Sequence, residues 1–147
     1  MKKTKSGFTL IELIVVMAIL AILSVIGLGS FRNAQIKGRD AQRKNDLSQT
    51  QKALELYFND YGGYPASLPA AGSTWDDGKT VYMKEMPTDP KNYAYCYEVD
   101  TSKYQWFRLY AKLENSDDPS IAKTGCSAGC SCGTSTYNYK ITSPYAP

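Results

Sequence analysis

Glu12 is the side chain whose type and position in this sequence most strongly indicate a chemical role. It is the only charged residue between positions 6 and 31, and it lies inside an apolar run. A carboxylate in the interior of a bilayer costs roughly 3 kcal/mol on insertion scales, so leucine would suit a simple anchor better. We therefore expect Glu12 to pair with another group inside the membrane.

The composition argues against several other functions. The chain has no histidine, which removes the commonest general acid or base and a major metal ligand. No acid/base pair stands out, so we expect no catalytic residues and no enzyme. The net charge of +3 comes from Lys2, Lys3 and Lys5, and the rest of the chain carries 14 basic and 14 acidic residues. Such a neutral remainder is not expected to bind nucleic acid directly, because that binding depends on neutralising phosphates.

Four cysteines form a second group with possible chemistry. Cys96 stands alone, whereas Cys126, Cys130 and Cys132 follow one another as C-x3-C-x-C. Zinc would need all four thiolates at an unusual spacing, and four free thiols are a further alternative. An even number in an exported domain favours disulfides. Cys130 and Cys132 are too close in sequence to bridge well, so Cys96 should pair with either of them and Cys126 with the other.

The apolar run that contains Glu12 predicts a membrane-spanning helix. Residues 8–28 would form a helix of about 31 Å, close to the roughly 30 Å hydrocarbon core. A cleaved secretory signal peptide has a shorter apolar core of about 7–15 residues, and a featureless anchor would not carry Glu12. Gly29 stands where the helix should leave the membrane.

The residues from Gly7 and Phe8 to Glu12, preceded by a short basic leader, resemble the class III leader of type IV prepilins and pseudopilins. The resemblance implies that a prepilin peptidase and methyltransferase cuts between Gly7 and Phe8 and methylates the new amino group of Phe8. It also implies that Glu12 pairs with the amino terminus of a neighbouring subunit and sets the axial register. The alternative is that Glu12 complements the N-terminus of its own helix.

Residues 40–61 have the pattern of an amphipathic helix. Apolar side chains recur at spacings of three, four and seven and share one face. These side chains are Leu47, Leu54, Tyr57, Phe58 and Tyr61. Charged side chains are expected mostly on other faces, and these are Arg43, Lys44, Lys52 and Glu55. Gly62 and Gly63 should end the helix, whose apolar face then needs a cover.

The rest of the chain predicts a small antiparallel sheet. Residues 93–99 and 104–113 are expected to pair as a hairpin around a turn at residues 100–102. One side of its second strand is apolar and should cover the helix; it carries Phe107, Leu109, Ala111 and Leu113. Residues 80–83 and 137–141 predict two further short strands, the latter at an edge, and residues 62–79 predict a loop.

A further resemblance, to the major pseudopilins of type II secretion, rests on Tyr64-Pro65, on residues 86–90 and on the hairpin that ends at Glu114. Relatives of that kind bind calcium in a loop late in the sheet domain, where Asp117 and Asp118 lie in this chain. Judged from the residues alone, two adjacent carboxylates more often form a solvated turn, because calcium needs six to eight oxygens. We expect no cofactor, with calcium as the one candidate.

Together these patterns predict an α+β fold: a long N-terminal helix packed on a small antiparallel sheet. Residues 1–7 would be the leader, 8–29 the transmembrane and assembly helix, 30–61 the stalk helix, and 62–147 an extracytoplasmic sheet domain with a cysteine-rich end.

The resemblance implies a structural subunit of a homo-oligomeric, type IV pilus-like filament that polymerises after leader cleavage. Its further partners would be an inner-membrane platform protein and an assembly ATPase. The subunit would cross the cell membrane once, with its N-terminus cytoplasmic before processing, and then join an extracellular or periplasmic filament. The alternative is a membrane-tethered extracytoplasmic binding module that does not polymerise. Whether the filament is a pilus, a secretion pseudopilus or a competence pseudopilus is left open.

Overall fold

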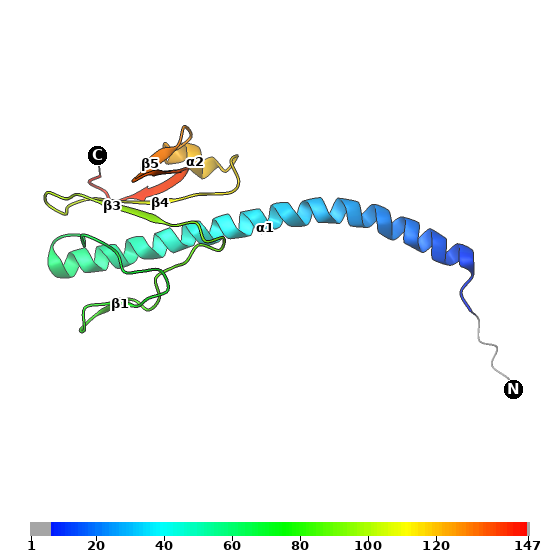
Figure 1. Ribbon diagram of the computed structural model, residues 1–147, viewed down its shortest axis with the longest axis horizontal. Helices are drawn as coiled ribbons and strands as arrows, with labels where there is room; N and C mark the ends of the chain where they lie inside the picture. Colours follow the sequence, from blue (N-terminus) through cyan, green and yellow to red (C-terminus); the bar gives the residue numbers. More distant parts are fainter. Residues whose placement is uncertain (1–6, 147) are drawn as a thin grey trace. The chain divides into compact units, whose positions relative to one another are not determined.

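The computed structural model describes residues 7–146, with the backbone alone for residues 26–28. The expected leader therefore lies outside the described residues except for Gly7. The chain divides into two compact units, Met1–Ile36 and Lys37–Pro147. Helix α1, Leu10–Tyr61, contributes residues to both units, and every strand belongs to the second (Figure 1). The predicted α+β fold is confirmed.

In the first unit, the structure describes residues 7–9 and the part of α1 from Leu10 to Ile36. Among the described residues α1 is the one helix long and apolar enough to cross a membrane, judged by length and composition. None of its apolar window is buried within the structure. The large apolar side chains described from Leu10 to Val25 are therefore available to lipid or to other helices.

Helix α1 ends where the glycine pair predicts. Its last residue is Tyr61, and Gly62 adopts a left-handed conformation with φ 72°. The N–H of Gly62 donates to the carbonyl oxygen of Phe58 at 2.7 Å. Glycine adopts this conformation without the steric penalty of a Cβ atom and so closes the last turn.

The predicted hairpin is confirmed, with shorter strands. Strands β3 (Cys96–Val99) and β4 (Phe107–Ala111) pair antiparallel, with Tyr97 opposite Leu109. Strand β7 (Tyr139–Thr142) pairs with the other side of β4 and forms the predicted edge strand. The order of this sheet is therefore β3-β4-β7.

Two smaller hairpins and a short helix complete the second unit. Strand β1 (Trp75–Asp76) pairs with β2 (Val81–Met83), so part of the expected loop 62–79 is extended. Helix α2 (Pro119–Lys123) precedes strands β5 (Cys130–Cys132) and β6 (Ser135–Tyr137), which pair with each other. The sequence did not predict these last three elements, because elements of three to five residues between turns show no clear periodicity.

The main core lies between α1 and the three-stranded sheet. Leu47 and Leu54 of the helix are 1% and 0% exposed and belong to one cluster with Phe107, Leu109 and Ala111 of β4. The predicted apolar face of residues 40–61 is thus confirmed as the stripe of this helix that packs on the sheet, except that Tyr61 is 55% exposed. Its hydroxyl donates to Asp77 Oδ2 at 2.6 Å at the surface.

The opposite face of the sheet is covered as well. Tyr110 points to the other side of β4 from its neighbours Leu109 and Ala111, because side chains alternate along a strand. It is buried in a second cluster with Cys132 and Tyr137. The segment carrying α2 and β5 lies over this face, while α1 lies along the other (Figure 1). The sheet is therefore a middle layer.

Candidate functional site

The N-terminal segment, residues 7–12, brings Thr9 and Glu12 together. The backbone N–H and the hydroxyl of Thr9 donate to Glu12 Oε2 at 2.8 and 2.7 Å. The N–H of Glu12 lies 3.3 Å from Thr9 Oγ1, which accepts from it. This reciprocal arrangement is a capping box, which satisfies amide groups at the start of a helix. Phe8 stands before it and is 88% exposed.

An apolar surface follows this capped start. Large apolar side chains from Leu10 to Val25 are about half exposed or more. Contiguous apolar surface on this scale is found at membrane or protein interaction sites. Within it, Glu12 is the only ionisable group. The segment can therefore bury apolar area against neighbours and offer one carboxylate for pairing.

The second unit contains a charged cluster that we define as Asp40, Arg43, Asp89 and Glu114. Arg43 is fully buried. Its Nε and Nη2 donate to the two carboxylate oxygens of Asp89, and its Nη1 donates to Asp40 Oδ1 and Glu114 Oε1, each at 2.8 Å. Arg43 is thus an exception to the expectation that the charged residues of this helix lie mostly away from its apolar, buried face. A buried guanidinium is tolerated here because three carboxylates surround it.

Further cations bind Glu114 from the rim of the cluster. Arg39 donates through Nε and Nη2 to the two carboxylate oxygens at 2.7 Å each, and Lys91 Nζ lies 2.9 Å from Oε2. The two hydrogen bonds from Arg39 lower the pKa of Glu114 well below its usual value. Lys91 and Arg43 lower this pKa further, whereas desolvation of the carboxylate raises it in part. Glu114 therefore remains ionised at any ordinary pH.

Asp40 also holds the backbone of the segment that leaves β4. Its Oδ1 accepts from the N–H of Glu114 at 2.9 Å and its Oδ2 from the N–H of Asn115 at 2.8 Å. Asn138 binds the same segment from the other side, at the N–H and carbonyl of Leu113. Asp40 from α1 and Asn138, which precedes β7, thus fix the start of the loop that follows β4.

The two calcium candidates, Asp117 and Asp118, lie in different surroundings. Asp118 Oδ2 accepts from Lys44 Nζ at 2.6 Å, and Asp118 Oδ1 accepts from the N–H of Ser120 as the N-cap of α2. Asp117 is exposed, and its N–H donates to Asn115 Oδ1. Within residues 7–146 no group of three Cys, Asp or Glu side chains is close enough to hold a metal ion. These residues do not fit a calcium site, because an ammonium group already occupies the Asp118 carboxylate.

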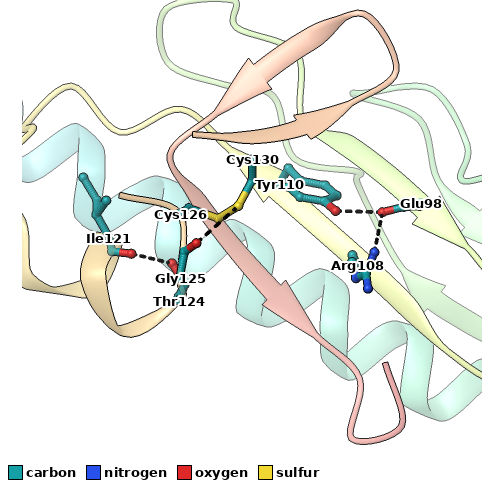
Figure 2. Close-up of a disulfide and its surroundings, with 8 residues drawn as sticks. All are labelled: Glu98, Arg108, Tyr110, Ile121, Thr124, Gly125, Cys126 and Cys130. Atoms are coloured by element: carbon teal, nitrogen blue, oxygen red, sulfur yellow. Dashed lines mark hydrogen bonds and ion pairs between the residues drawn. A yellow bond between two sulfur atoms is a disulfide. The ribbon is translucent and has the colours of Figure 1, made fainter. Parts of the chain in front are cut away.

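The structure pairs Cys96 with Cys132 and Cys126 with Cys130. This is one of the two pairings that the sequence left open. The first disulfide joins β3 to β5, and the second closes a short turn after α2. Figure 2 shows the second one beside the Thr124–Gly125 turn, with Tyr110 donating to Glu98 at 2.7 Å nearby. The Cys96–Cys132 disulfide therefore ties the segment that covers the second face to the sheet, and the Cys126–Cys130 disulfide constrains that segment internally.

Sequence reasoning missed most of the charged cluster. It gave no role to Asp40, Asp89 or Glu114, nor to Arg39 at the rim. The charges at 39, 40, 43 and 44 nevertheless lie within little more than one helical turn. That spacing could have indicated a charged helix face. It could not have shown that the partners lie 46 and 71 positions farther along the chain from Arg43.

Several known proteins are similar to parts of this chain. Residues 2–28 match the family described as the prokaryotic N-terminal methylation motif. The chain is 35% identical to the fimbrial protein EcpC of Eikenella corrodens over 49% of this chain and 47% of that protein. It is 28% identical to the type II secretion system core protein G of Pseudomonas aeruginosa over 75% of this chain and 84% of that protein.

A third relative is the type IV major pilin protein PilE1 of Neisseria gonorrhoeae, 29% identical over 60% of this chain and 51% of that protein. The chain thus spans about half the length of the fimbrial and pilin relatives and most of the secretion protein. No solved structure matches the chain significantly.

Proposed function

We propose that this chain, which belongs to the family of type IV pilins and type II secretion pseudopilins, is a structural subunit of a filament that polymerises after its leader is removed. The observation that carries the proposal is the exposed apolar segment with one carboxylate directly after the Gly7–Phe8 junction. Such a segment can be stable in lipid or against its own copies. The chain acts by assembly, and no catalytic step is assigned to it.

Leader removal would occur between Gly7 and Phe8. Cleavage there would remove all three leader lysines, which otherwise hold the N-terminus at the charged lipid surface. It would also create an amino group at Phe8, on the exposed residue that precedes the capped helix start. A peptidase and methyltransferase would then methylate this group. Removal of the lysines lowers the cost of drawing the helix out of the bilayer.

Glu12 would receive the amino terminus of a neighbouring copy. In the single subunit both Thr9 bonds are accepted by Oε2, so Oε1 is the oxygen that we expect to bind the neighbour's ammonium group. A paired charge interacts strongly in a medium of low dielectric constant. Because the pairing has a fixed geometry, it would set how far adjacent subunits are displaced along the filament axis.

The remaining chain would serve the same assembly. Residues 8–29 would form the transmembrane and assembly helix, 30–61 the stalk helix, and 62–147 the extracytoplasmic domain. The subunit would cross the membrane once, with its N-terminus cytoplasmic before processing, and end in a filament outside the cytoplasm. Its partners would be its own copies, the prepilin peptidase, an inner-membrane platform protein and an assembly ATPase.

The test compares Glu12→Leu with Ser24→Ala, a control on the exposed face of the same helix, in cells that contain the assembly machinery. Both variants should insert and lose the leader, which an intact mass beginning at methylated Phe8 would show. A loss of about 1.4 kcal/mol at each contact lowers the equilibrium constant of that contact about tenfold. We therefore expect the amount of sheared filaments to fall by more than about tenfold for Glu12→Leu. Ser24→Ala should assemble normally.

Two results would contradict the proposal. Filaments at the normal level from Glu12→Leu would mean that the carboxylate has no role in assembly. Functional protein that still begins at Met1 would mean that no amino group forms at Phe8 for Glu12 to bind.

A further inference from the structure

Cationic side chains of helix α1 hold the loop between β4 and α2, residues 112–118. Arg39 and Arg43 bind Glu114 near the start of this loop, and Lys44 binds Asp118 at its end. The ammonium group of Lys44 also donates to Ser120 Oγ at 3.0 Å. A side chain from one helix therefore bridges the last loop residue and the first turn of α2.

This is the region in which the resemblance to secretion pseudopilins implied calcium. A divalent cation holds such a loop by collecting oxygen ligands around one positive centre. In this chain, the carboxylate oxygens of the loop already accept hydrogen bonds from nitrogen donors. Both carboxylate oxygens of Glu114 accept from cations, and the two oxygens of Asp118 accept from Lys44 and from the N–H of Ser120.

The charges around this loop are already balanced. The carboxylates of Asp40, Asp89, Glu114 and Asp118 face four cationic groups. These groups belong to Arg39, Arg43, Lys44 and Lys91. A calcium ion placed at Asp118 would lie beside the Lys44 ammonium, which is 2.6 Å from Oδ2. Repulsion between two cations at such short range opposes binding.

We propose that Lys44, together with Arg39, replaces a divalent cation in this chain by fastening the β4–α2 loop to helix α1. Because these cations are covalently part of the helix, the fold of the loop does not depend on the calcium concentration outside the cytoplasm. The inference goes beyond the filament role and does not depend on it, since it concerns the fold of a single subunit.

The first experiment measures calcium dependence directly on the full chain in mild detergent. Its melting temperature should be the same in EDTA and in millimolar calcium chloride. A site whose Kd lay a hundredfold below the calcium concentration would raise that temperature by about 10 °C. Equilibrium dialysis against radioactive calcium should find no stoichiometric binding.

The second experiment removes the fixed cation. Lys44→Met should open the loop more often, which increases cleavage after Lys123 by endoproteinase Lys-C, a protease that does not need calcium, by about fivefold. The matched control is Lys52→Met, an exposed lysine on the same helix, which should leave that cleavage rate unchanged. Added calcium should not restore protection to Lys44→Met.

The proposal is overturned by any of three results. These are a melting temperature of the natural chain that rises by several degrees with calcium, stoichiometric calcium binding, and equal Lys-C cleavage after Lys123 in the Lys44→Met and Lys52→Met chains. The first two would show that a divalent ion binds despite Lys44. The third would show that Lys44 does not hold the loop.

Discussion

Replacing Arg43 by methionine should destabilise the second unit more than the loss of any surface charge. Methionine keeps much of the side-chain volume but has no donor for Asp40, Asp89 or Glu114. Asp40 and Asp89 are 2% and 4% exposed, so water cannot readily take over the bonds that the guanidinium makes. The ring of Tyr93, 5.5 Å from the guanidinium carbon, would also lose its cationic neighbour.

The size of the effect follows from burial. Removing one partner of a buried ion pair costs about 3–5 kcal/mol, whereas an exposed pair contributes less than about 1 kcal/mol. For a unit of about this size, 1 kcal/mol corresponds to about 4 °C in melting temperature. The expected decrease for Arg43→Met is therefore about 12–20 °C. Arg43→Lys keeps the charge without the two-pronged geometry and should give an intermediate decrease.

The assay is thermal unfolding of the full chain in mild detergent with both disulfides intact. The fluorescence of Trp75, which is 5% exposed, reports on the core of the second unit. Lys52→Met is the matched control because Lys52 is exposed on the same helix, and it should change stability by no more than about 0.5 kcal/mol.

The reasoning is refuted if Arg43→Met lowers the melting temperature by less than about 4 °C, the equivalent of an exposed pair. That result would mean that Arg43 does not lie buried among the three carboxylates. A large decrease for Lys52→Met as well would show that the assay responds to detergent or charge in general.

Two further predictions concern acid and the disulfides. Arg39 and Lys44 lower the pKa values of Glu114 and Asp118, so the unfolded chain binds more protons than the folded one once the pH falls below about 4. The melting temperature should therefore be steady near neutral pH and fall as the pH passes through the lowered pKa values; an unchanged value at pH 3 would contradict this. Replacing Cys96 and Cys132 by alanine should cost about 4 kcal/mol, against about 2 kcal/mol for the disulfide that closes the shorter loop. Equal decreases in melting temperature for the two disulfide pairs would contradict the chain-entropy argument.

The long elements of this protein were predictable because their patterns are local. The stripe that includes Leu47 and Leu54 repeats with the helix period, and Gly62 ends the helix through its own backbone freedom. The alternation around Leu109 likewise predicted which face of β4 meets the helix. Helix α2 and strands β5 and β6 were missed because such short elements are stabilised by caps, disulfides and neighbours more than by their own periodicity.

The sequence by itself determined the capped N-terminal segment, the apolar run and the place of Glu12 within it, because these features depend on residues adjacent in the chain. Only the tertiary structure decided the surroundings of Arg43 and the partner of Cys96. Arg43 meets Glu114 across 71 positions, and Cys96 meets Cys132 across 36. No local pattern contains such contacts, because they form only when the sheet closes over the helix and excludes water from the charges between them.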